Sequence, residues 1–427
     1  MIERIIIQNL YNNYNYDILF SKEQRVTIIT GPNGYGKTSL LKIIHNLLSC
    51  NFWFFYFLRF KQICIVFNNG LSMHIQKEIT EAEENDREDK TTVSAKERVI
   101  FRLCDSQNII ETFDLSEEYI LKLRRQLIPP YRLRQIDDFD LEEILSKEYD
   151  IDTDLLLLGK SRNIRMFLQD KKCVFIKEQR IITSTQEYEH NKLLNRYEID
   201  DIAKQLINKF TRQQTEFASE SQKIDSTFIK RLVNKMHNTY DEETFQKKLS
   251  ALKTKINCYR IYGLMPQIDI LEEYPEDLQN VLSLYIDDME RKMSSFDKFY
   301  KQLSLFDRFV SDKILSNKRI KLNENKGITV LNDKEEEIPL HKLSSGEQNL
   351  IILCYKLAFA TDTRTVLLID EPENSLHMAW ISKMLDDYQQ MAKDLKCQII
   401  IATHSPAFIN DCWDLSCDLF ANNKENN

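Results

Sequence analysis

The segment Gly31-Pro32-Asn33-Gly34-Tyr35-Gly36-Lys37-Thr38 constrains the fold of this chain more than any other feature. It matches the phosphate-binding loop G-x-x-x-x-G-K-[ST] at every fixed position. The apolar residues 26–29 before it have the pattern of a buried strand, and residues 39–44 after it that of a helix start. A strand, this loop and a helix in that order predict an α/β domain that binds a nucleotide.

The chemistry of this loop follows from its backbone. Glycines let successive N–H groups converge on a phosphate, and the N-terminus of the following helix adds its positive end. Lys37 is expected against the β- and γ-phosphates, and the Thr38 hydroxyl is expected to ligate Mg²⁺. The residues expected to contact ATP are Asn33, Gly34, Tyr35, Gly36, Lys37, Thr38 and Ser39.

A second glycine-containing motif lies far along the chain, at Leu343-Ser344-Ser345-Gly346-Glu347-Gln348. Only eight residues are glycine, and four of them fall in this motif and the phosphate-binding loop, which indicates two places of special backbone geometry. A helical pattern follows over residues 350–359, and either Ser344 or Ser345 suits its N-cap. Such a helix start is also a candidate anion site.

Two further strands are expected to end in polar residues. Residues 366–369 are apolar and run into Asp370 and Glu371, the Walker B pattern. There the first carboxylate orders Mg²⁺ and the second polarises the attacking water. Residues 399–403 form another apolar strand that ends at His404, in the position where ligands bind in open α/β sheets.

Composition limits the remaining possibilities. The chain has 427 residues, enough for one large domain with an insertion or for two domains. Its net charge of −8 means that nucleic acid would have to bind a local basic patch. The nine cysteines lack metal-ligand spacing and fit reduced thiols in the cytoplasm. The N-terminus has a strand pattern, and no apolar run reaches the roughly 20 residues of a membrane helix; the apolar residues 52–58 are expected in the core.

The middle of the chain is less informative. Residues 63–75 alternate around Asn68-Asn69-Gly70, which predicts a hairpin, and 99–103 and 109–113 predict two more strands. Residues 116–168 and 190–320 have mostly helical patterns. An apolar stripe over 275–315, continuous as one helix, predicts a projecting hairpin that packs on a partner helix or subunit; an ordinary core helix is the alternative. Its members are Leu278, Leu282, Tyr285, Met289, Met293, Phe296, Leu303, Phe306 and Val310.

Together these motifs resemble the ABC-type ATPases of the SMC/Rad50/RecF/OLD group. The resemblance implies an α/β ATPase head with an antiparallel β subdomain and a long helical, coiled-coil-like insertion. The head would comprise residues 1–185 and 326–427, and the insertion, suited to protein contacts, residues 186–325. The resemblance also implies that Thr38, Gln179 and Asp370 hold Mg²⁺, that Glu371 is the general base, and that His404 contacts the γ-phosphate.

In that group the segment 343–348 is the signature motif, which closes over the nucleotide of a second subunit. Ser344, Ser345, Gly346 and Glu347 would then act in trans, within a head-to-tail dimer or a higher homo-oligomer. This agrees with the physical argument, because two anion sites per chain for one nucleotide imply a second copy.

A narrower resemblance is to the PtuA ATPases of the Septu anti-phage defence system. It rests on residues 178–180, on 371–377 with Trp380, and on 402–406 through 409–411 to Trp413. His377 stands where transporter-type relatives carry Asp, and a surface position at a helix start is as good an explanation for it as a functional one. The resemblance implies an HNH nuclease, PtuB, as a separate partner. The seven scattered histidines and the 14 residues after Trp413 lead us to expect no nuclease in this chain.

Two functions of different class remain open. The first is a nucleotide-gated scaffold that controls a partner nuclease. The second is a DNA-binding ATPase of the RecF or Rad50 kind, acting in DNA repair; a subunit of a transporter is a distant third. Basic residues would favour the second function, although a solvated helix face explains them as well. They are Lys122, Arg124, Arg125, Arg132, Arg134, Lys160, Arg162, Arg165, Lys171 and Lys172.

Overall fold

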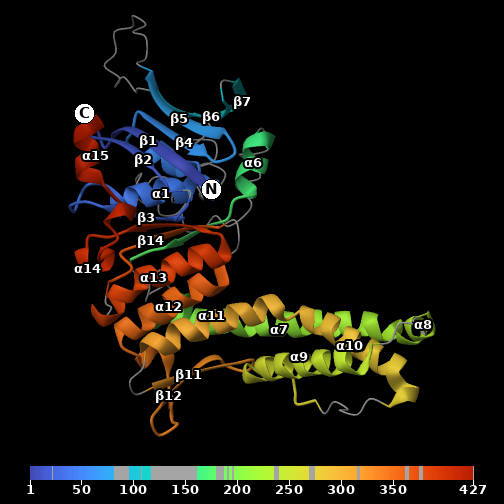
Figure 1. The fold of residues 1–427 in the computed structure, drawn as a ribbon. Helices are drawn as coiled ribbons and strands as arrows, with labels where there is room; N and C mark the ends of the chain where they lie inside the picture. The colour runs from blue at the N-terminus through green and yellow to red at the C-terminus, as the bar shows by residue number, and fades with distance from the viewer. Residues whose placement is uncertain are drawn as a thin grey trace, which may run out of the picture. The chain divides into compact units, whose positions relative to one another are not determined.

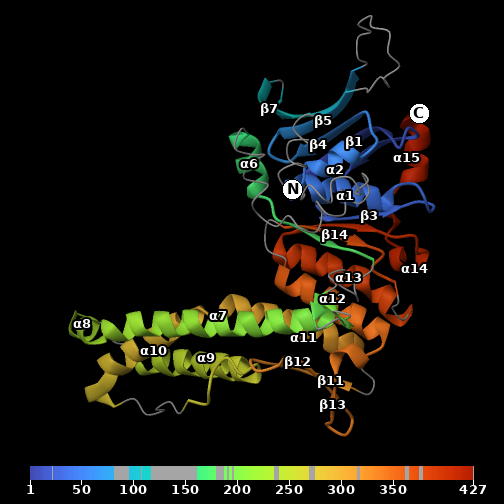
Figure 2. The same ribbon diagram turned by 180° about the vertical axis from the view of Figure 1, so that it is seen from behind.

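The computed structural model describes residues 1–21, 23–80, 96–106, 108–116, 161–178, 187–189, 192–194, 197–234, 240–268, 275–314, 318–360, 365–374 and 378–426. The chain divides into two compact units (Figures 1 and 2). The first consists of Met1–Glu178 with Thr361–Asn427, and the second of Gln179–Ala360.

The first unit contains a six-stranded antiparallel sheet of order β2-β1-β4-β5-β6-β7. The predicted hairpin is confirmed, because β4 and β5 pair antiparallel across the turn that contains Gly70. The other two predicted strands correspond to β6 and β7. The strands are β1 (Ile2–Leu10), β2 (Tyr14–Leu19), β4 (Gln62–Phe67), β5 (Leu71–Thr80), β6 (Lys96–Asp105) and β7 (Asn108–Ser116).

A five-stranded parallel sheet forms the second layer of this unit, with the order β16-β3-β15-β14-β8. Its strands are β3 (Val26–Thr30), β8 (Cys173–Ile176), β14 (Val366–Asp370), β15 (Gln398–Ala402) and β16 (Ser416–Asp418). Every residue of β14 and β15 is buried, as expected for strands covered on both faces. The helix α1 (Lys37–Leu48) packs on β14, β15 and β8, and α13 (Met378–Leu395) packs on β15 and β3 (Figure 1).

The apolar segment 52–58 lies in the core of the first unit, as the sequence predicted. It forms the short helix α2 (Trp53–Phe57), and the rings of Phe52 and Phe55 pack on Phe101 of β6, with centroids 4.7 and 5.6 Å apart. The remaining helices of this unit are α6 (Arg162–Gln169), α14 (Pro406–Ile409) and α15 (Leu419–Asn426). None of the helices in the described residues is both long and apolar enough to cross a membrane.

The second unit is mainly helical. Its helices are α7 (Glu198–Ser226), α8 (Phe228–Asn234), α9 (Glu242–Ile261), α10 (Gln279–Ser294), α11 (Asp297–Ile314) and α12 (Ser345–Ala360). A small antiparallel sheet joins β11 (Lys318–Asn323), β12 (Gly327–Asn332) and β13 (Glu337–Ile338), and β9 (Glu187–Glu189) pairs with β10 (Lys192–Leu194). The strand β12 touches α7 at Gly327, where a Cβ atom would lie 2.3 Å from the carbonyl oxygen of Ala203.

The apolar stripe over 275–315 occupies two helices instead of one. The chain breaks between α10 and α11 at Ser295 and Phe296, and the stripe packs on helices of the same chain. The Phe296 ring stacks on Phe217 of α7 at 4.7 Å, and Phe306 lies 6.0 Å from Phe359 of α12. The expectation of one continuous helix is therefore wrong. The stripe packs on partner helices of its own chain, which was one of the two kinds of partner expected. Most of the helical pattern over 116–168 lies outside the described residues.

One buried ion pair ties α8 to α10 in the second unit. Arg231 makes a two-pronged hydrogen bond to the carboxylate of Asp288, whose side chain is only 6% exposed, and also donates to the Ile224 carbonyl. Replacing Asp288 by Asn removes the hydrogen-bonded counter-charge of the guanidinium and leaves only the more weakly interacting Asp225. We therefore expect the free energy of unfolding to fall by about 3 kcal/mol, measured by urea unfolding followed by helix circular dichroism. Glu216→Gln is the control, because the exposed pair of Glu216 with Arg212 should contribute less than about 1 kcal/mol. Equal effects of both variants would contradict the assignment.

Candidate nucleotide-binding site

The phosphate-binding loop has the predicted context, since β3 ends at Thr30 and α1 begins at Lys37. Gly36 is the N-cap residue of α1, with φ of 76°, and Gly34 has φ of 87°. These left-handed conformations explain why glycine stands at both positions. The loop therefore leads directly into the N-terminus of α1, the end of a helix that stabilises an anion.

Lys37 lies inside the loop. Its side chain is buried, and Nζ donates to the carbonyl oxygen of Gly31 at 2.9 Å and to that of Pro32 at 3.4 Å. The ammonium group thus spans the loop, at the place where the phosphate chain of a nucleotide is expected.

Thr38 and Asp370 meet across 332 residues of sequence. The Thr38 hydroxyl lies 2.9 and 3.2 Å from the two carboxylate oxygens of Asp370, which is buried at the end of β14. A hydroxyl and a carboxylate at this separation are the oxygen ligands that Mg²⁺ prefers, so both residues fit the proposed metal site. Gln179, the third expected ligand, lies outside the described residues.

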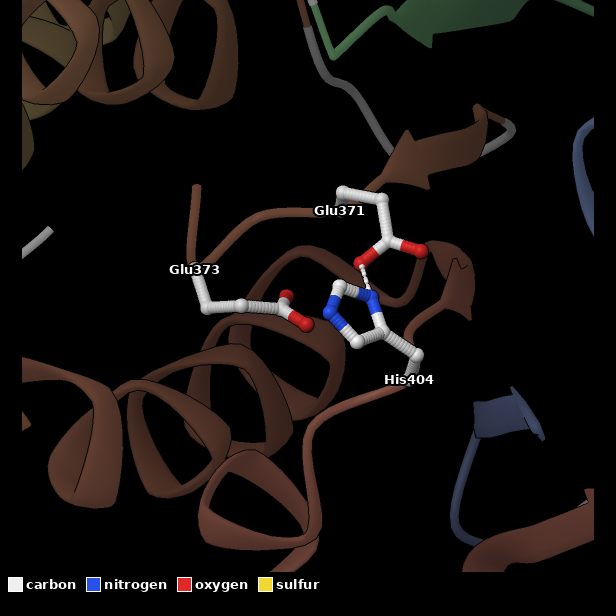
Figure 3. Close-up of side chains that lie close together, drawn as sticks. All are labelled: Glu371, Glu373 and His404. Atoms are coloured by element: carbon white, nitrogen blue, oxygen red, sulfur yellow. Dashed lines mark hydrogen bonds and ion pairs between the residues drawn. The ribbon is translucent and has the colours of Figure 1, made fainter. Parts of the chain in front are cut away.

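Glu371 and His404 are also brought together. They follow neighbouring strands β14 and β15, and the His404 Nδ1 lies 2.6 Å from the Glu371 Oε2 (Figure 3). Glu371 has φ of 45°, and its backbone N–H donates to the Ala402 carbonyl at 2.9 Å. The Glu371 side chain is 12% exposed and that of His404 is 61% exposed, so the pair forms a shielded carboxylate beneath an accessible imidazole.

A third carboxyl group, that of Glu373, lies next to this pair. Its nearest ligand atom and those of Glu371 and His404 all lie within 4.8 Å of one another. The Thr403 hydroxyl donates to one oxygen of Glu373, and burial together with the charge of Glu371 raises the pKa of Glu373 to about 7. No role for Glu373 was predicted from the sequence, although its place two residues after Glu371 indicated that it could lie near the site.

Another residue of the same turn makes contact with the end of β8. Asn374 donates a hydrogen bond of 2.7 Å to the Glu178 side chain, and Glu178 directly precedes Gln179 in the sequence. The turn after β14 is therefore connected both to the His404 segment and to the residues that follow β8.

The other loop residues expected to contact ATP are placed as follows. Asn33 is exposed. The Tyr35 ring packs on Tyr14 and Phe420, with centroids 5.4 Å away in each case. The Tyr16 hydroxyl donates to the Tyr35 carbonyl at 2.7 Å, so the side chain of Tyr35 supports the loop from outside. The Ser39 hydroxyl lies 2.9 Å from the Tyr11 hydroxyl.

The segment 343–348 forms the start of α12, in the second unit. Ser344, and not Ser345, is the cap: its hydroxyl accepts from the Glu347 N–H at 3.3 Å, and the Glu347 carboxylate accepts from the Ser344 N–H at 2.9 Å. This is a capping box. Burial raises the pKa of Glu347, but hydrogen bonds from Lys318 and Ser344 outweigh it and hold that pKa below its usual value. Gly346 lies in the first turn of α12, and His377 lies outside the described residues.

The basic residues that would favour DNA binding are only partly described. Lys122 to Lys160 lie outside the described residues, and Lys171 donates to the Phe167 carbonyl at 2.9 Å, with Nζ 3.5 Å from the centre of the Phe167 ring. Arg162 and Lys172 are exposed and Arg165 is half-buried. The part of the chain that the structure describes thus contains only four of these ten basic residues, and the DNA-binding alternative stays a prediction.

The fold and the phosphate-binding loop place this chain among the α/β P-loop proteins with a Walker-type site. The family model described as the AAA ATPase domain matches residues 1–409, and the chain belongs to that family. A search of curated proteins found no match.

Solved structures of SMC head domains are similar to this chain. One is the Smc head domain with an extended coiled coil bound to the C-terminal domain of ScpA, from Pyrococcus furiosus, with 16% identity, a TM-score of 0.38, and coverage of 96% of this chain and 90% of that one. Another is the SMC head domain from Thermotoga maritima, with 14% identity, a TM-score of 0.31 and the same coverage. The expected fold class, an α/β head with an antiparallel sheet, a parallel sheet and long helices, is confirmed.

The raised pKa of Glu373 predicts a stability effect with a definite sign. The native carboxyl holds its proton up to about pH 7, whereas an unfolded Glu releases it near pH 4.3. Stability from this group is therefore present below pH 4.3 and is lost as pH rises through 7. Glu373→Gln should remove this loss. The difference in free energy of unfolding between this variant and wild type should therefore shift by about 2 kcal/mol in favour of the variant from pH 5 to pH 8. Urea unfolding at both pH values measures the difference, and parallel pH profiles would contradict it.

Proposed function

We propose that this chain binds ATP with Mg²⁺ and hydrolyses it, using Lys37, Thr38 and Asp370 for the phosphates and the metal. Glu371 is the general base, and His404 senses the γ-phosphate. One observation carries the proposal: the carboxyl ends of β3, β14 and β15, three neighbouring strands, present the loop, the two carboxylates and the histidine at one edge of the sheet. Ligands bind at this edge in open α/β sheets.

The pairing of Glu371 with His404 suggests how hydrolysis is controlled. A general base must face the water that it activates, and at 2.6 Å the imidazole engages the carboxylate. A γ-phosphate that attracts His404 would release the carboxylate toward water. The protein would therefore keep its base occupied until the nucleotide is in place.

We further propose that the active form is a head-to-tail dimer, or a higher homo-oligomer built from such dimers. The start of α12 supports this, because Ser344, Ser345 and Gly346 lie at the N-terminus of a 16-residue helix, which attracts anions. The residues 1–185 and 326–427 would form the head, and residues 186–325 the helical insertion. Analytical ultracentrifugation with and without ATP tests this proposal, and a strictly monomeric species with ATP bound would overturn it.

At the level of biology, we propose a Septu-like defence ATPase that gates a separate HNH nuclease. Its support is the resemblance of residues 371–377 and 402–413 to the Septu ATPases, together with the family match. The first test is whether the adjacent gene encodes an HNH protein. Co-expression with that protein, co-purification, and plasmid cleavage with ATP present or depleted then test the control of the nuclease. Failure of the two proteins to associate would overturn the nuclease role, while the ATPase assay would still stand.

The assay of ATPase activity itself is direct. Purified protein is mixed with ATP and Mg²⁺, and phosphate release is followed, with EDTA as the blank. Salt-dependent binding to duplex DNA, lost in a variant that neutralises Arg162 and Lys172, would favour the DNA-handling alternative.

A further inference from the structure

Glu373 is buried beside the hydrolytic residues without an assigned role. Glu373 is 8% exposed and lies two positions after Glu371, on the turn that follows β14. One carboxyl oxygen accepts from the Thr403 hydroxyl; the other, Oε2, is buried and has no hydrogen-bond partner among the described residues. Most buried polar atoms in folded proteins have a hydrogen-bond partner, so a buried carboxyl oxygen without one calls for a reason beyond packing.

The Thr403 hydroxyl relays this contact to the segment that carries His404. It donates to Glu373 and accepts from the backbone N–H of Ser405 at 3.0 Å. The Thr403 backbone N–H donates to the Ile29 carbonyl of β3 at 3.1 Å. His404 therefore lies between Thr403 and Ser405, whose backbones are both fixed by hydrogen bonds. Glu373 contributes to this restraint through its hydrogen bond with the Thr403 side chain.

The imidazole of His404 lies between two carboxyl groups. Figure 3 shows its ring with one nitrogen bonded to Glu371 and the other directed toward Glu373. The ligand atoms of the three side chains are within 4.8 Å of one another. Removal of Glu373 would take away the buried carboxyl group on this side of the ring and would release Thr403 from the turn after β14.

We propose that Glu373 is a positioning residue that acts through Thr403 and holds the segment of His404 beside Glu371. It keeps the ring in the place from which it can leave Glu371 for a γ-phosphate, so that the carboxylate is released only when the nucleotide is bound. The proposal rests on the hydrolytic role proposed for Glu371 and His404. It predicts a defect in turnover and not in ATP affinity, because neither Glu373 nor Thr403 belongs to the phosphate-binding loop.

Four variants and one control test this. Glu373→Ala and Thr403→Val remove the contact; Glu373→Gln and Thr403→Ser keep an acceptor or a hydroxyl in the same place. Thr27→Val is the control, since Thr27 is a buried threonine of β3, in the same parallel sheet. We expect the first two to lower kcat at least tenfold with KM for ATP within about threefold of wild type, and the conservative pair to stay within about threefold in kcat.

A second readout does not need turnover. The His404 ring is labelled with ¹³C, and its NMR resonance is assigned by comparison with His404→Gln. Without nucleotide, this resonance should shift in Glu373→Ala and in Thr403→Val. It should stay unchanged in Thr27→Val. An unshifted resonance in folded Thr403→Val and Glu373→Ala would overturn the positioning role. If the wild-type protein does not hydrolyse ATP but the variants show the expected resonance shifts, the proposed hydrolysis is overturned and the positioning role stands. If Glu373→Ala does not fold, Thr403→Val decides.

Discussion

Replacing Lys37 by Ala should weaken ATP binding by about two orders of magnitude. The ammonium lies within hydrogen-bond distance of the Gly31 and Pro32 carbonyls, in the centre of the loop, and a charge-assisted hydrogen bond to a phosphate contributes about 1.5–3 kcal/mol. That energy corresponds to about 10- to 150-fold in affinity. Isothermal titration with a slowly hydrolysed ATP analogue and Mg²⁺ measures the change.

Controls separate loss of binding from loss of fold in this variant. Lys37 is buried at the start of α1, so circular dichroism and a thermal melt must show a folded protein. Lys42→Ala, on the same helix but exposed, should bind ATP as wild type does. Wild-type affinity in a folded Lys37→Ala protein would contradict the placement of the phosphates in this loop.

Replacing Glu371 by Gln should lower kcat by about two to four orders of magnitude while ATP binding persists. A general base contributes about this much, and an amide cannot accept the proton of the attacking water. The amide keeps the shape of the side chain that follows β14, and Lys37, Thr38 and Asp370 are unchanged. We expect ATP to stay bound and the closed dimer to accumulate.

Two measurements follow this variant. Rapid-quench phosphate release gives the rate, and light scattering after size exclusion gives the mass with ATP. Asp370→Asn is the informative comparison, because it should lose Mg²⁺-dependent binding as well as turnover. A Glu371→Gln protein that hydrolyses ATP at the wild-type rate would assign the base to another residue. Glu373, which has a carboxyl oxygen within 4.8 Å of one of Glu371, is then a candidate.

Much of the site was predictable because its signals are local. The loop between β3 and α1 needs glycines where φ is positive, and Gly34 and Gly36 stand there. Both strands with polar ends, β14 and β15, were predicted from short apolar runs, and the parallel pairing brings their ends together. A pattern of a few residues suffices for each of these predictions.

Other features were beyond the sequence because they depend on distant packing. The apolar stripe over 275–315 shows which face of a helix is buried, but not what covers it. Only the folded chain shows that Phe217 and Phe359 cover it, and that the helix breaks at Ser295. Periodicity gives the direction of a side chain relative to its own helix axis, and says nothing about the neighbour.

The sequence by itself predicted the loop in which a nucleotide phosphate is expected, because hydrogen-bonding geometry and glycine conformation within eight residues define that loop. The tertiary structure alone decided which groups surround Glu371. Burial raises the pKa of Glu373, while the Thr403 hydroxyl, thirty residues later, donates to this carboxyl group and opposes the rise. Burial and long-range hydrogen bonds set the protonation of such a group, and neither is encoded in its immediate neighbours.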